Sequence, residues 1–184
     1  MLFFFIIFLP SLTLATLSWL VPASASLFAA AAVAGLLVLR DAVAGRSLKL
    51  LNLTMLVLFG GLGGALLLSP ALSAIGVRIA IDAGLLIAAL VALALRFPFT
   101  LQYAREEAAP DAAAMPDFIR INYVLSLAWI GAFALMLVAD IVALRWPVLP
   151  LWTALAVAFI ARNAAVGFTR WYIRRARGRA AAAT

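Results

Sequence analysis

Two opposite charges interrupt one of the most apolar stretches of this chain, and they are the residues best placed to hold a proton or a solute. In GVRIAIDAG, residues 76–84, Arg78 and Asp82 are four residues apart, so on a helix they share a face and can pair. Asp140 and Arg162 lie within two later apolar runs. An ionisable side chain inside a membrane is costly and therefore faces protein or water, which makes these four residues candidates for function.

The segments that must position these charges are long apolar runs. The chain has 184 residues, of which 68% are hydrophobic and only 11% charged, whereas a soluble domain is about 25% charged. A membrane-spanning helix needs about 20 mostly apolar residues. We therefore expect an all-α polytopic membrane protein, a single transmembrane domain over 1–184. Its six transmembrane helices are predicted at 2–21, 24–40, 48–69, 71–95, 121–145 and 149–170.

The distribution of basic residues predicts the orientation, because Lys and Arg are enriched in cytoplasmic loops. A cytoplasmic N-terminus leaves only Arg145 on the outer side. The cytoplasmic side then holds Arg40, Arg46, Lys49, Arg96, Arg105, Arg120, Arg170, Arg174, Arg175, Arg177 and Arg179. We therefore predict both termini in the cytoplasm, a cytoplasmic loop at 96–120, and a basic cytoplasmic tail at 171–184 beside anionic lipids.

The first run resembles a secretion signal, because the small residues at 23–25 suit a cleavage site. No Lys or Arg precedes it and it is long for a signal, so an uncleaved helix is expected. Pro10 inside this run should kink it.

The depths of the four charged residues predict one ion-pair network. Counted from the outer ends of their spans at about 1.5 Å per residue, Asp82 matches Arg162 and Arg78 matches Asp140. Asn52 and Asn163 would add polar support. One interpretation is structural, with buried ion pairs that fix the register of the helices. The other is a site for a proton or a solute.

Residues 96–120 form the one long connection, and their pattern suggests an interfacial segment. Phe97, Phe99, Leu101 and Tyr103 are expected to lie against the membrane. Gln102, Arg105, Glu106 and Glu107 are expected to face water. Asp117, after Pro116, is expected to cap the next helix.

Small residues in FGGLGGALL, residues 59–67, predict a close helix contact. Gly60 and Gly64 form a GxxxG pair, and Gly61 and Ala65 repeat the spacing beside it. Such residues let helix backbones approach in a membrane. The contact is either within the chain or a dimer face.

The absence of Cys and His excludes thiol chemistry, the usual zinc sites, bis-histidine haem and a histidine base. We expect no catalytic residue, metal, cofactor or nucleic-acid partner. The function that fits is a scaffold or assembly partner in the cell envelope, working with a membrane-protein partner or a second copy. The alternative is a small solute, ion or proton transporter, or its membrane substrate-binding subunit, built on the Asp/Arg network.

Two segments resemble known families. RFPFTLQYARE, residues 96–106, is similar to a segment of uncharacterised multi-spanning bacterial inner-membrane proteins, which implies that location. Lys49 to Leu62, ending in FGGL, resembles the intracellular septation protein A family. That family is implicated in envelope and division processes, so this resemblance also implies a role in the envelope.

Overall fold

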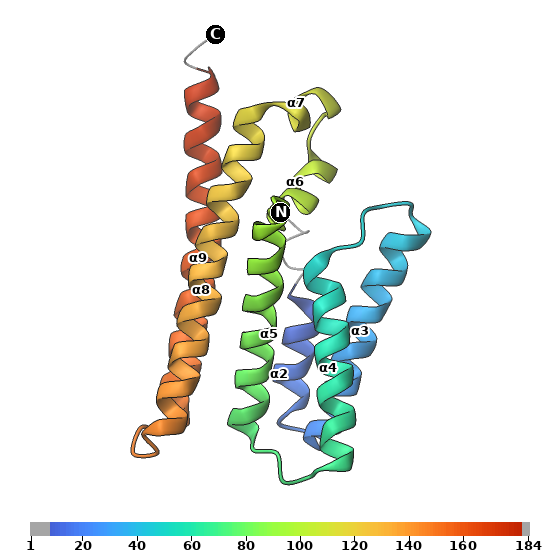
Figure 1. The fold of residues 1–184 in the computed structure, drawn as a ribbon, viewed down its shortest axis with the longest axis vertical. Coiled ribbons are helices and arrows are strands. Elements are labelled where there is room, and N and C mark those ends of the chain that lie inside the picture. Colours follow the sequence, from blue (N-terminus) through green and yellow to red (C-terminus); the bar gives the residue numbers. More distant parts are fainter. Residues whose placement is uncertain (1–7, 182–184) are drawn as a thin grey trace. The chain divides into compact units, whose positions relative to one another are not determined.

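The computed structural model describes residues 8–181, and every regular element in that range is a helix, which confirms the all-α prediction (Figure 1). The chain divides into two compact units, Met1–Ala88 and Ala89–Thr184, and α5 runs from one into the other. The helices are α2 (Leu9–Leu17), α3 (Ala23–Val43), α4 (Leu50–Leu68), α5 (Ala74–Ala94), α6 (Thr100–Glu107), α7 (Pro110–Ala114), α8 (Pro116–Arg145) and α9 (Leu151–Ala181). That the two units form a single domain stays a prediction.

Five helices are long and apolar enough to cross a membrane: α3, α4, α5, α8 and α9. They correspond to the five predicted spans from 24–40 to 149–170. Residues 2–7 of the first predicted span, 2–21, lie outside the described residues, and its described part contains α2. Pro10 occupies the first turn of α2, where a missing N–H costs nothing, and the kink predicted at Pro10 stays a prediction. Six spans with both termini in the cytoplasm stay a prediction.

Small residues bring the helices of the first unit together. In this unit α3 packs against α2 and, antiparallel, against α4. A Cβ added at Gly63 of α4 would lie 3.2 Å from the ring of Phe28 on α3. On α5, a Cβ at Gly84 would lie 2.5 Å from Leu58 of α4. Glycine therefore fits these two contacts because of the space available, and a larger residue would displace the Phe28 or Leu58 side chain.

Two helices end in the same capping arrangement, one with glycine and one with arginine. After α3, the Arg46 N–H donates to the Asp41 carbonyl, and Gly45 between them has a φ of 64°. After α5, the Phe97 N–H donates to the Ala92 carbonyl, and Arg96 has a φ of 58°. Both are Schellman caps, in which the left-handed position usually holds glycine.

The second unit is built on the antiparallel pair α8 and α9, which lie side by side in Figure 1. Large side chains of α8, among them Trp129 and Phe133, are buried on one face. The buried residues of α9 are small: Ala154, Ala161, Ala165 and Thr169. The indole Nε1–H of Trp129 donates to Thr169 Oγ1 at 3.2 Å, which fixes the register of the two helices.

The prediction that Asp117 caps α8 was wrong. The N-cap position is Met115, and α8 begins at Pro116. Proline suits the first helical position because its fixed φ and missing N–H fit there. Asp117 falls in the first turn instead, where its negative charge interacts favourably with the helix dipole.

Candidate functional site

A buried hydroxyl network joins α6 to α8 in the second unit. Thr100 Oγ1 donates to the Asn122 carbonyl at 2.8 Å and lies 2.9 Å from Ser126 Oγ. Ser126 is fully buried and Asn122 is 2% exposed. The side chain of Asn122 donates to the Phe118 carbonyl, while its Oδ1 has no hydrogen-bond partner among the described residues. The network holds the first turn of α6 on α8. The sequence analysis missed it, although the i,i+4 spacing of Asn122 and Ser126 indicated a shared face.

The aromatic face predicted for residues 97–103 is not formed as expected. Phe99 is 3% exposed, and its ring centroid lies 6.4 Å from that of Phe133 of α8. Leu101 is also 3% exposed, whereas Phe97 is exposed. The chain is helical from Thr100, so residues two apart, such as Leu101 and Tyr103, point to different sides of α6. Phe99 and Leu101 are therefore core residues rather than membrane-facing ones.

The polar residues of α6 follow the predicted division only in part. Arg105 and Glu107 are exposed, whereas Gln102, Tyr103 and Glu106 are half-buried. That this helix lies at the membrane surface stays a prediction.

The four predicted network residues lie on helices that are long and apolar enough to cross a membrane. Arg78 and Asp82 lie on α5 in the first unit, and Asp140 and Arg162 lie on α8 and α9 in the second. Asp140 is fully buried and Asp82 is 6% exposed, while both arginines are half-buried. The carboxylates are thus shielded, as the cost of a charge in lipid requires. The network that would join the two pairs stays a prediction.

A second cluster of buried polar residues lies at the α3–α4 loop of the first unit. Asp41, near the end of α3, is fully buried and accepts from the Arg40 guanidinium at 2.7 Å. Lys49, just before α4, is 1% exposed and donates to the carbonyl and the hydroxyl of Ser47, both at 3.0 Å. Asn52 is 2% exposed. Two acceptors here, Asp41 Oδ2 and Asn52 Oδ1, have no hydrogen-bond partner among the described residues.

The burial of Asp41 and Lys49 was not predicted, because both are charged residues next to a loop, where charged side chains are usually exposed. One feature of the sequence indicated that Asp41 is unusual. It is an acidic residue near the C-terminal end of a helix, in RDAVAG, where the helix dipole favours cations. Asn52 is buried at this cluster, in the first turn of α4, and its predicted support of the charge network stays a prediction.

Asn163, the other expected support, lies on an exposed face of α9. Its Nδ2 donates to the Phe159 carbonyl of the same helix at 2.8 Å. Ile160, Ala164 and Gly167 are exposed with it, and the spacing of these four residues defines one helix face, here called the outer face of α9. A Cβ added at Gly167 would meet nothing within 4 Å.

Of the small residues of α4 predicted to make a close contact, Gly60 faces α3. A Cβ at Gly60 would lie 4.0 Å from Ala31 of α3, whereas a Cβ at Gly61 or Gly64 would meet nothing within 4 Å. Ala65 is half-buried. The tight contact is made by Gly63, whereas the space beside Gly61 and Gly64 is open. A dimer face there stays a prediction.

Among residues 8–181, no group of three or more carboxylate side chains is arranged to hold a metal ion. Comparison of the chain with protein-family models, with curated proteins and with solved structures found no match.

Proposed function

We propose that this protein is an assembly partner in the inner membrane of a bacterium, which binds another transmembrane helix through the outer face of α9. The observation that supports this function is the exposed amide of Asn163. α9 is a candidate membrane span from Trp152 onward, and Asn163 is about 16 Å from Trp152, which is near the middle of a hydrocarbon core about 30 Å thick.

The amide of Asn163 has unused hydrogen-bonding capacity. One N–H donates within the helix, whereas the second N–H and the Oδ1 acceptor have no partner among the described residues. Lipid chains offer neither donors nor acceptors, so each unpaired group is unfavourable there. A polar side chain on a neighbouring helix removes this cost, and one such bond contributes about 0.6 kcal/mol on average and about 1.7 kcal/mol at most.

The rest of the outer face suits close helix contact. Ala164 and Gly167 are small, and the space beside Gly167 is open, so a partner backbone can approach there. The opposite side of α9 is already covered by α8 through residues such as Ala161 and Thr169.

Photo-crosslinking in native membranes tests this function. A crosslinking residue replaces Gly167, and the same residue at Ala161, which is buried, is the matched control. We expect a discrete protein adduct from position 167, and Asn163→Leu should lower its yield about 3- to 20-fold, while Asn163→Gln should retain most of it. Adducts with lipid alone, or a yield that does not respond to Asn163→Leu, would refute the proposal.

A second candidate, proton or solute transport, is favoured by the burial of Asp82 and Asp140 within membrane-spanning helices. Intramembrane carboxylates of this kind line the pathways of pumps and transporters. Purified protein in liposomes should then conduct protons or solutes, and Asp140→Asn should abolish the flux. Flux equal to that of protein-free liposomes would eliminate this candidate.

A further inference from the structure

We propose that the C-terminal end of α9 binds the headgroups of anionic lipids through a stripe of three arginines, Arg170, Arg174 and Arg177. This inference concerns a different part of α9 from the outer-face contact and does not depend on the proposed function. The three residues are spaced i, i+4, i+7, so they lie on one side of the helix over about 10 Å. All three are exposed.

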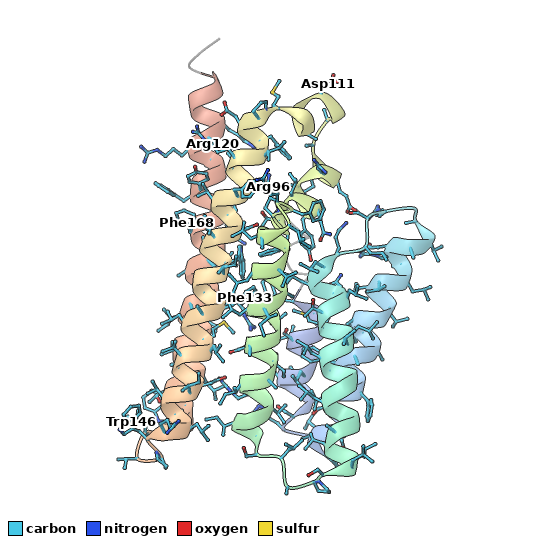
Figure 2. All side chains as sticks on the ribbon, viewed as in Figure 1. Arg96, Asp111, Arg120, Phe133, Trp146 and Phe168 are labelled. Atoms are coloured by element: carbon cyan, nitrogen blue, oxygen red, sulfur yellow. The ribbon has the colours of Figure 1, made fainter. Side chains whose placement is uncertain are left out.

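The guanidinium groups of this arginine stripe are available for an anion. Among the described residues, none of the three makes a hydrogen bond or an ion pair. The α9 sequence contains no Asp or Glu. The acidic side chains Glu107, Asp111 and Asp117 lie on α6, α7 and the first turn of α8, and Arg120 adds a further exposed positive charge on α8 (Figure 2).

The length of α9 places the stripe at the level of lipid headgroups. The helix has 31 residues and is therefore about 46 Å long, whereas the hydrocarbon core is about 30 Å thick. Counted from Leu151, the core ends near Arg170, and the last third of the helix extends beyond it. Trp146 lies at the opposite end of the unit, as Figure 2 shows.

An aromatic cluster marks the same level. The ring centroids of Phe168, Trp171 and Tyr172 lie between 5.6 and 6.2 Å apart, and Arg175 stacks over Trp171 at 5.4 Å. Trp and Tyr concentrate at membrane–water interfaces because their rings are apolar and their tips polar. The arginine stripe therefore emerges where phosphate groups are found.

Charge selects an anionic lipid over a second copy of this chain as the occupant. Two copies in one membrane are parallel, so contact through this side of α9 would bring two arginine stripes together and cause repulsion. Lipid phosphates are present at this depth at high concentration, and each nearby arginine adds to their attraction.

Lipid titration of the full chain in detergent tests the proposal. Native mass spectrometry counts bound phosphatidylglycerol and phosphatidylcholine, and a thermal melt reports the stabilisation by each. The test variant replaces Arg170, Arg174 and Arg177 with Gln. A second variant keeps the charge by placing Lys at the same three positions. The control is Arg145→Gln, which removes an arginine at the C-terminal end of α8, far from the stripe along the antiparallel pair.

We expect selective binding of phosphatidylglycerol, a loss of roughly 100-fold in its affinity in the Gln variant, and little change in the Lys variant or the control. The single change Arg174→Gln should lose about 5-fold, which keeps the test valid if the triple variant does not fold. Equal binding of both lipids, or full affinity in the Gln variants, would overturn the proposal. Equal stabilisation by inorganic phosphate would also overturn it, because the ligand would then be a free anion. Displacement of the lipid by polyglutamate would overturn it as well, because the ligand would then be an acidic protein.

Discussion

Replacing Thr100 with valine should loosen α6 from α8, because valine keeps the shape of threonine and removes its hydroxyl. That hydroxyl makes two buried contacts, to the Asn122 carbonyl at 2.8 Å and to Ser126 Oγ at 2.9 Å. A side-chain hydrogen bond contributes a net of about 1 kcal/mol, so we expect a loss of about 2 kcal/mol in the free energy that holds α6 in place. Local opening should then become roughly 30-fold more frequent.

The absence of cysteine makes this opening measurable. Leu101→Cys introduces a single buried thiol in the first turn of α6, and its rate of modification reports how often the helix opens. Thr100→Val in this background should raise the rate roughly 30-fold. Thr153→Val is the matched control, because that hydroxyl makes only an exposed bond to the Pro150 carbonyl, and it should leave the rate nearly unchanged.

Adding Ser126→Ala separates the network from a simple loss of packing. If the two hydroxyls act together, the double variant should open less often than the product of the two single effects predicts. A rate within about threefold of the parent protein in Thr100→Val would show that the hydroxyl does not hold α6, and the reasoning would fail.

Two further predictions concern backbone positions. Gly84→Ala should destabilise the first unit by about 1–3 kcal/mol, because the new Cβ would lie 2.5 Å from Leu58. The control Gly131→Ala, where a Cβ meets nothing within 4 Å, should not destabilise the protein. Equal melting temperatures of the two variants in detergent would contradict this prediction. Arg96→Gly should stabilise the protein by about 1 kcal/mol and Gly45→Ala should destabilise it by a similar amount, because both positions have a positive φ. Chemical unfolding measures both changes in stability, and changes of the same sign would refute the explanation.

The sequence alone predicted six apolar spans, and at five of them the structure has a helix long and apolar enough to cross a membrane. This succeeded because length and apolarity are properties of a contiguous segment, and the membrane acts on each segment separately. Helix ends were less predictable. Pro116 begins α8 and Asp117 does not cap it, since capping depends on the φ and ψ of one residue.

The interior of each unit depended on tertiary contacts. No pattern in residues 96–107 showed that Phe99 would face Phe133, because a side chain is buried only when another helix covers it. The same holds for the glycines of α4, since all of them have the size needed for close packing, but only Gly63 lies opposite the Phe28 ring.

The candidate sites divide in the same way. Composition and spacing marked Asp82, Asp140 and Asn163 as polar residues within apolar runs, because polarity in lipid is visible in a single segment. Only the packing of α9 on α8 decided that Asn163 is exposed while Thr169 is buried against Trp129. The sequence therefore determined which segments are apolar enough to enter a membrane, and the tertiary structure determined which polar groups are buried inside the protein and which remain exposed.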